Sequence, residues 1–383
     1  MNDILLTNKQ KLDEVFHYLH THPEVSWKEE QTTAYLKELI EREGFTVQTF
    51  DDCTGLFVEI GEGTTCIGVR ADIDALWQEV DGVFQANHSC GHDAHMTMAF
   101  GALLHLKEKG FPKDIRFKWI FQPAEEKGKG AEKLVSKGII DDIDYLYGVH
   151  LRPIQEIGDG TASPAIHHGA ASILQGTISG QDAHAARPHL GANAIEVGAA
   201  IVQGLQGIRL DPMVPYSAKM TKLHAGSETG NIIPGNGSFS IDLRAQTNDM
   251  MTHLNEKVQL VLKQVEYLYD VAIDVNVHLN LVAAIVDNEA CDLMERAIVD
   301  VLGEEYVQPP IVTPGGEDFH FYSAHVPTLK ATMLGLGCDL SPGLHHPKMK
   351  FNQECIHKGS NILAQVVLLT AEEVKLLENV RLP

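Results

Sequence analysis

Residues 115–126 read IRFKWIFQPAEE, an apolar run that ends in a proline and a pair of glutamates. Such a run is typical of a strand that is buried on both faces, as in parallel sheets. Similar strands are expected at 66–73 and 145–151, and a helix with one apolar face is expected at 92–109. Strands that alternate with helices predict an α/β domain, with a mostly parallel sheet and helices on both faces.

The pattern changes after residue 170, where strands and helices follow one another in the order β-α-β-β-α-β. This is the ferredoxin-like arrangement, which can fold as a compact inserted unit. We therefore expect a catalytic domain made of residues 1–169 and 285–383, interrupted by a small α+β domain at 170–284. The expected elements of the insert are strands at 171–179, 217–225, 236–245 and 272–284, and helices at 193–207 and 249–268.

The chain has 383 residues, of which 52 are acidic and 30 basic, so its formal charge is −22. Surfaces that bind nucleic acid or anionic membranes need a basic field, so neither partner is expected. The six cysteines form no C-x-x-C pair, and a chain of this length does not need disulfides, so reduced thiols are expected. Residues 1–16 lack the basic and apolar regions of a secretory signal, and no apolar window of about 18 residues could span a membrane. A cytoplasmic protein is expected.

The densest group of reactive side chains is HSCGHDAH, at residues 88–95. Cys90 and His92 lie two apart at a predicted turn before a helix and can face one metal ion. A thiolate with an imidazole suits zinc or another borderline divalent ion. The alternative is a polar helix N-terminus, where the helix dipole favours Asp93. This run by itself does not decide between the two.

Further candidates stand at the ends of other predicted strands, where sites form in α/β sheets. Glu125 and Glu126 follow the strand at 115–121, although a solvated charge pair is the alternative. His150 ends a second strand and His345 follows a third. Five ligands are too many for one catalytic zinc and suit two metals that share a bridging group. The five are Cys90, His92, Glu126, His150 and His345.

The motifs HSCGHDAH, FQPAEE, GVH and LHHP resemble those of the dinuclear metallo-amidohydrolases of the aminoacylase and carboxypeptidase type. The branch with a metal-binding cysteine is the most similar. It includes hippurate hydrolases, indoleacetyl-amino-acid hydrolases and N-acetyl-diaminopimelate deacetylases, and the chain is particularly similar to bacterial amidohydrolases of the AmhX type. The resemblance covers essentially the whole chain, and its supporting segments are LHTHPEVSWKEEQTT, VRADIDAL, SGQDAHAARPH, TGNIIPG and GGEDFHFY.

The resemblance implies the same five metal ligands, two divalent ions per subunit, and Glu125 as the general base. Zinc or manganese is expected, and cobalt or nickel would also suit the site. The insert is implied to be a lid that also mediates dimerisation. His184 matches a lid histidine that polarises the scissile carbonyl, and Asn231 and Arg244 match lid positions that hold the substrate carboxylate.

Some residues depart from the family pattern or stand outside it. Trp77 occupies a position where the family usually has proline, and the segment SIDLRAQ around Arg244 is closer to the aminoacylase branch. These departures leave the acyl preference and the role of Arg244 open. Asp74, which follows the strand at 66–73, is interpreted as an acceptor that holds a ligand histidine or a loop of the metal site. A strand-end cap is the alternative.

The expected function is hydrolysis of N-acyl amino acids or related conjugates by a metal-activated water. A small dipeptidase or carboxypeptidase on the same two metals is the alternative enzyme. A silent binding protein with this fold is disfavoured because Glu125 is intact. A serine hydrolase is disfavoured because no G-x-S-x-G motif occurs. The expected partners are a small-molecule substrate and a second copy that docks through the lid.

Overall fold

The computed structural model describes residues 2–381 and divides the chain into two compact units. The first unit comprises Met1–His167, Ile285–Ile311 and Asp318–Pro383. The second comprises His168–Ala284 and Val312–Glu317. The first unit is therefore interrupted in sequence, because the chain leaves it, builds most of the second unit, and then returns.

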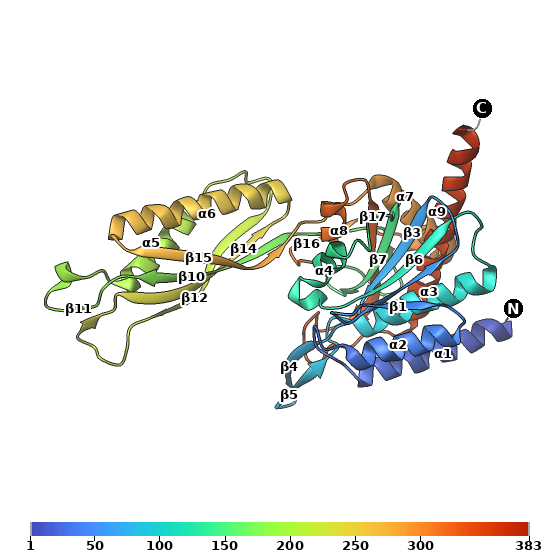
Figure 1. Ribbon diagram of the computed structural model, residues 1–383, viewed down its shortest axis with the longest axis horizontal. Helices are drawn as coiled ribbons and strands as arrows, with labels where there is room; N and C mark the ends of the chain where they lie inside the picture. Colours follow the sequence, from blue (N-terminus) through green and yellow to red (C-terminus); the bar gives the residue numbers. More distant parts are fainter. Residues whose placement is uncertain (1, 382–383) are drawn as a thin grey trace. The chain divides into compact units, whose positions relative to one another are not determined.

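A seven-stranded sheet forms the centre of the first unit, in the order β1-β2-β6-β3-β7-β17-β8 (Figure 1). The four strands β6, β3, β7 and β17 are mutually parallel, as the apolar runs predicted. The outer strands β1 and β2 on one side and β8 on the other are antiparallel to their neighbours, so the sheet is mixed. A short connection such as the one between β1 and β2 suits antiparallel neighbours, whereas parallel strands need a long crossover. The bounds are β1 Val47–Thr49, β2 Leu56–Ile60, β3 Cys66–Asp72, β6 Arg116–Gln122, β7 Tyr145–Pro153, β8 Ala162–Ser163 and β17 Lys330–Leu340.

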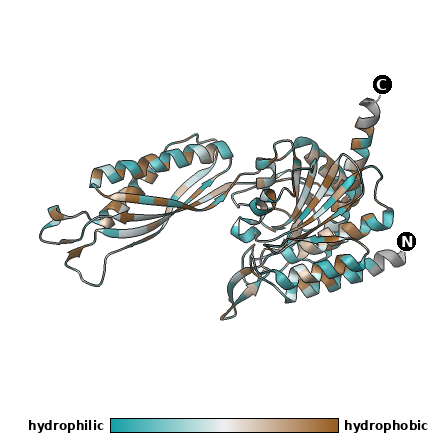
Figure 2. Ribbon diagram, viewed as in Figure 1, coloured by the Kyte–Doolittle hydropathy of each residue, from teal (hydrophilic) through white to brown (hydrophobic). Residues whose placement is uncertain are grey.

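Helices cover this sheet on both faces, since every residue of β3 is buried. The helices α3, α7 and α9 pack against the strands and against one another, while α4 contacts β6 and α8. Figure 2 shows hydrophobic residues concentrated on the central strands, where the core of the unit lies. The bounds are α1 Asn2–Thr21, α2 Glu30–Arg42, α3 His92–Lys109, α4 Gly130–Ser136, α7 Asn288–Leu302, α8 His320–His325 and α9 Glu354–Arg381, with 3-10 turns η1 Glu125–Lys127 and η3 Glu304–Tyr306.

Within the first unit, β4 (Leu76–Val80) and β5 (Val83–Asn87) form a hairpin between β3 and α3. Its turn residues Asp81 and Gly82 both have positive φ, the backbone that two-residue hairpin turns favour. The hairpin was not anticipated from the sequence, because its strands are short and mostly exposed. Two further short strands are β9 (Ile166–His168) and β16 (Ile311–Thr313).

The second unit is an antiparallel sheet in the order β12-β14-β10-β15, with helices α5 and α6 packed against it. Its main elements follow the expected order β-α-β-β-α-β. Each helix starts at a side-chain cap: Asn193 accepts from the amide of Ile195, and Thr247 accepts from that of Met250. The bounds are β10 Ala170–Ser179, α5 Ala194–Gln206, β12 Tyr216–Ala225, β14 Asn236–Ala245, α6 Asn248–Tyr269 and β15 Ala272–Leu281, with short β11 Ala183–His184, η2 Pro188–Leu190 and β13 Ile232–Ile233. Within the described residues of both units, no helix has the length and apolar character needed to cross a membrane.

Candidate metal centre

The candidate ligands come from segments that lie at the carboxyl ends of the central strands of the first sheet. Because β3, β6, β7 and β17 are parallel, the loops that follow them start at the same edge. Asp74 follows β3, and Glu125 and Glu126 follow β6. His150 lies near the end of β7, and the loop that carries His345 follows β17. The start of α3 contributes the remaining candidates.

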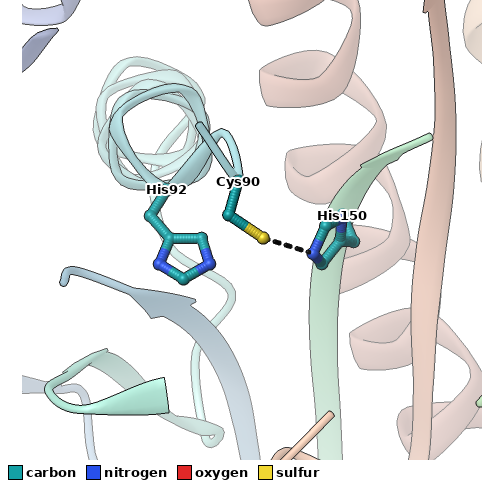
Figure 3. Close-up of side chains that lie close together, drawn as sticks. All are labelled: Cys90, His92 and His150. Atoms are coloured by element: carbon teal, nitrogen blue, oxygen red, sulfur yellow. Dashed lines mark hydrogen bonds between the residues drawn. The ribbon is translucent and has the colours of Figure 1, made fainter. Parts of the chain in front are cut away.

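Cys90, His92 and His150 form a compact buried group (Figure 3). The Sγ atom of Cys90 lies 3.6 Å from Nε2 of His150. One ligand atom of each residue lies within 4.8 Å of the others, which is close enough to hold one metal ion. Gly91 has φ +94°, a left-handed backbone that glycine adopts at little cost, and it lets Cys90 and His92 flank the turn into α3.

Hydrogen bonds orient both of these histidines. The Nδ1 atom of His92 bonds the main-chain oxygen of Asp74 at 2.8 Å, and Nδ1 of His150 bonds the main-chain oxygen of Leu151 at 2.7 Å. A carbonyl oxygen only accepts, so each Nδ1 is the donor in these bonds, and Nε2 is the ring nitrogen that faces the group. Burial opposes the positive charge on His92, but Asp72 and Cys90 outweigh it and raise the pKa of His92 well above its usual range, so a metal ion would have to displace a proton there. The Nε2 atom of His92 is buried and has no hydrogen-bond partner among the described residues, as expected of a nitrogen that binds metal.

Glu126 lies between the histidines of the site. Its Oε1 atom is 3.9 Å from Nε2 of His92, and its Oε2 atom is 3.5 Å from Nε2 of His345. That Oε1 atom is also buried without a partner among the described residues. Glu126 belongs to two of the groups that could hold a metal ion, one with Cys90 and His345 and one with His92 and Glu125. Its two carboxylate oxygens therefore face two different candidate histidines.

The loop after β17 delivers His345 to the solvent side of the group. The amide of His345 donates to the main-chain oxygen of Ser89 at 2.7 Å, next to Cys90. Its main-chain oxygen accepts from Nε2 of Gln78 on β4 at 3.1 Å. The backbone at His345 is left-handed, with φ +63°. The side chain is 55% exposed, so it borders the opening of the site while the other candidates are largely buried.

Two buried carboxylates hold the loop that carries the paired glutamates. The amide of Ala124 donates to Oε1 of Glu29 at 2.9 Å. The next two amides donate to Asp74: Glu125 to Oδ1 at 3.1 Å and Glu126 to Oδ2 at 3.0 Å. The hydroxyl of Ser26 donates to the same Oδ2 at 2.6 Å. Asp74 thus supports the glutamate loop through its carboxylate and orients His92 through its main-chain oxygen.

The electrostatics of the group suit a bound cation. Burial raises the pKa of the Cys90 thiol well above its usual range and raises the pKa of Glu126 to about 7. Burial and the nearby His95 hold the pKa of His150 well below its usual range, so its imidazole stays neutral. A divalent cation would reverse the first two shifts, since positive charge favours thiolate and carboxylate. Neutral imidazole is already the form that binds metal.

A second buried network lies beside the candidate ligands. His95 bonds Oδ1 of Asp72 through Nδ1 at 2.8 Å and accepts from the amide of Leu151 through Nε2 at 3.0 Å. The guanidinium of Arg70 donates to Asp72 at 2.6 Å and to Asp318 at 2.8 Å. Asp72 and His95 thus have hydrogen-bond partners, which agrees with a structural role for His95.

The three remaining sequence-predicted residues lie in the second unit. His184 is exposed on β11, and its Nδ1 accepts from the amide of Ala186 at 3.0 Å. Asn231 is also exposed, and its main-chain oxygen accepts from the amide of Ala185 at 3.0 Å, so these two residues lie on neighbouring segments. Arg244 lies on a different strand, β14, where Asp242 accepts from its Nε and Nη2 atoms, both at 2.9 Å.

The sequence pattern of peptidase family M20/M25/M40 matches residues 68–369. The chain belongs to this family. Membership confirms the resemblance expected from the motifs and the hydrolase class of the enzyme. N-acetyl-L-cysteine deacetylase of Bacillus subtilis is 29% identical over 97% of this chain and 92% of its own length. N-acetyldiaminopimelate deacetylase of Lactiplantibacillus plantarum is 30% identical over 91% of this chain and 94% of its own length.

A solved structure has the same fold as this M20/M25/M40 family member. It is a dinuclear metal-binding peptidase of family M20 from Bacillus subtilis, with a TM-score of 0.80 and 23% identity. The alignment covers 96% of this chain and 99% of that one. The likeness confirms the predicted fold class.

Sequence reasoning about this family member overlooked the residues that support the site. Glu29 and Ser26 lie in the segment LHTHPEVSWKEEQTT, which was noted for its resemblance but given no role. Asp72 was likewise overlooked. The signal for Asp72 was present in RADIDAL, because Arg70, Asp72 and Asp74 alternate with apolar residues and would share one face of a strand. The signal for Glu29 was absent, because a glutamate before a helix usually faces solvent.

Proposed function

We propose that the protein is a metal-dependent amidohydrolase that cleaves the amide bond of N-acyl amino acids or related amino-acid conjugates. One observation carries the proposal: the buried Nε2 of His92 and Oε1 of Glu126 have no hydrogen-bond partner among the described residues, and Cys90 and His150 lie beside them. A metal ion would satisfy both atoms. The named relatives are deacetylases of N-acetylated amino acids, which supports the substrate class.

The five proposed ligands are Cys90, His92, Glu126, His150 and His345, and they would hold two divalent ions per subunit. Glu126 would contribute a carboxylate within reach of both His92 and His345, since each of its oxygens faces one of these histidines. A thiolate among imidazoles and a carboxylate suits zinc, and manganese, cobalt or nickel are the other candidates. When bound, such ions lower the pKa of a coordinated water toward neutrality and polarise the amide carbonyl.

Glu125 is proposed as the general base. It accepts the proton of the attacking water and then returns a proton to the leaving nitrogen, because an amide nitrogen leaves poorly unless it is protonated. Proton transfer of this kind contributes about 10² to 10⁴-fold in rate. The Oε2 atom of Glu125 lies 3.9 Å from Nε2 of His92, so the base stands at the edge of the ligand group.

Residues 170–284, which form most of the second unit, are proposed to act as a lid and as a dimerisation domain. Residues 1–169 and 285–383 are proposed to form the catalytic domain. His184 would polarise the scissile carbonyl, and Asn231 and Arg244 would hold the substrate carboxylate. A substrate would have to share the guanidinium of Arg244 with Asp242, which already accepts two of its hydrogen bonds. A cytoplasmic location stays a prediction; the six cysteines are all free thiols.

Metal analysis combined with a substrate screen tests the proposed function. Protein reconstituted with zinc, manganese, cobalt or nickel would be assayed with N-acetyl amino acids, N-benzoyl amino acids and dipeptides. About two ions per chain and preferential hydrolysis of the N-acyl substrates are expected. Preference for dipeptides would instead favour the dipeptidase alternative. Full metal content without hydrolysis of any of these substrates would favour the silent binding protein.

A further inference from the structure

The carboxylate of Glu29 is fully buried although it stands just before a helix. Glu29 occupies the N-cap position of α2, but its side chain is buried and makes no cap bond. Its two oxygens turn inward: Oε1 accepts from the amide of Ala124, and Oε2 accepts from the hydroxyl of Thr54 at 2.5 Å. Burying a carboxylate is costly, and burial raises the pKa of Glu29. One of these bonds supports the glutamate loop, the other joins Thr54, and neither caps α2.

The backbone that Glu29 contacts is strained. Ala124 has φ +54° and ψ 39°, the left-handed conformation that costs a residue with a Cβ atom about 1 kcal/mol or more. Such a conformation persists only where its surroundings over-determine it. Here Glu29 holds the amide of Ala124, and Asp74 holds the amides of Glu125 and Glu126. Three successive amides are therefore fixed from two sides.

We propose that Glu29 is a positioning residue, which holds the left-handed backbone at Ala124 and thereby aims the Glu125 side chain at the metal centre. The inference rests on the proposed function, in which Glu125 is the general base. Misplacing a reacting group by about 1 Å can cost on the order of 10²-fold in rate. The loss falls on kcat, because a misaligned base leaves substrate binding unchanged.

Three substitutions separate the hydrogen bond from the charge. Glu29→Ala removes the acceptor, and Glu29→Asp keeps the charge but is one methylene too short to reach Ala124. Glu29→Gln removes the charge and keeps both bonds: its carbonyl accepts from Ala124, and its amide donates to the Thr54 hydroxyl, which can accept. We expect kcat to fall by about 10 to 100-fold in the Ala and Asp variants and to stay within about threefold in the Gln variant.

Two further variants make the test specific to the backbone. Thr54→Val removes the other partner of Glu29 and leaves the Ala124 bond, so kcat should stay within about threefold of the parent. Glycine adopts positive φ at little cost, so adding Ala124→Gly to Glu29→Ala should recover at least about fivefold in kcat. A general destabilisation of α2 would not be repaired at residue 124.

The experiment combines steady-state kinetics, metal content and hydrogen exchange on the full-length, metal-loaded variants. Glu29→Ala and Glu29→Asp should lower kcat with KM and metal content unchanged, and should speed amide exchange across residues 122–128, whereas Glu29→Gln should not. A kcat within twofold of wild type in both the Ala and Asp variants would overturn the proposal. So would metal loss that Ala124→Gly does not repair. If Glu29→Ala fails to fold, Glu29→Asp decides.

Hydrogen exchange also separates this inference from the proposed function. A wild-type enzyme that hydrolyses no N-acyl amino acid would refute the proposed function. In that case the exchange rates at residues 122–128 still show whether Glu29 holds the loop. Unchanged exchange in an active enzyme would refute the positioning role alone.

Discussion

Replacing Asp74 by asparagine tests the support of the glutamate loop more severely than any change at Glu29. Both oxygens of Asp74 face main-chain amides, which can only donate: Oδ1 accepts from Glu125 and Oδ2 accepts from Glu126. In Asp74→Asn one of these oxygens is replaced by an NH₂ group, which donates and cannot accept. Either rotamer of asparagine therefore sets two donors against each other, and one main-chain bond is lost.

The magnitude follows from the bonds involved. A hydrogen bond to a charged group contributes about 1.5–3 kcal/mol, and a buried donor left without an acceptor costs about 1–3 kcal/mol. Asp74→Asn should therefore lower the free energy of unfolding of the metal-free protein by about 2–3 kcal/mol. Because the lost bond orients Glu125 or Glu126, kcat should also fall by about 10²-fold.

Ser26→Ala is the matched control for Asp74→Asn. It removes the 2.6 Å hydroxyl bond to Asp74 but leaves both main-chain bonds. This variant should lose about 1.5–3 kcal/mol, since it too gives up one hydrogen bond to the carboxylate, but it should keep kcat within about threefold. Denaturant unfolding, with an unchanged m-value, measures the free energy, and steady-state kinetics measures kcat. If Asp74→Asn matches Ser26→Ala in both measurements, the carboxylate does not hold the loop and the reasoning fails.

The remaining predictions concern single groups. Glu125→Gln should keep its metal and lose nearly all turnover; near-normal kcat would remove Glu125 as the base. Cys90→Ser should lower metal content, measured by elemental analysis, and full metal with full activity would mean that the sulfur is not a ligand. His184→Ala should lower kcat without metal loss, whereas metal loss would argue for a structural role. The hydrogen bond to Asp93 raises the pKa of His20, so their pair is present below about pH 6.5 and is lost as pH rises through the folded pKa. His20→Asn should therefore cost up to about 1 kcal/mol at pH 5.5 and almost nothing at pH 8.5; equal losses in denaturant unfolding would contradict this.

The elements with a regular pattern of apolar residues could be predicted from the sequence. The helix expected at 92–109 has those bounds, because Gly91 and Gly110, both with positive φ, delimit an apolar run. The central parallel strands were predicted from their unbroken apolar character. The β4–β5 hairpin was not, because Trp77 and Phe84 are exposed and pack against no core that would impose a pattern. The elements that could be predicted are those whose packing against the core imposes an apolar pattern on the sequence.

The candidate site shows the same division. Cys90 and His345 were proposed as ligands from their motifs, and the structure brings them near Glu126. Their ligand roles stay predictions. The motifs could not predict which distant residues hold the site in place, such as Glu29, which accepts a hydrogen bond from the amide of Ala124. That contact depends on tertiary packing, which reverses the usual preference of a glutamate for solvent.

The interrupted first unit has a consequence for how the protein is made. The ribosome synthesises Cys90, His92, Glu126 and His150 first, then most of the second unit, and only afterwards β17 and His345. Until β17 pairs with β7, the sheet edge beside His150 lacks its neighbour and the ligand set is incomplete. A chain that has been synthesised only as far as the second unit therefore carries four of the five proposed ligands and lacks His345. The proposed metal centre can thus be completed only after the ribosome has made β17 and the loop that follows it.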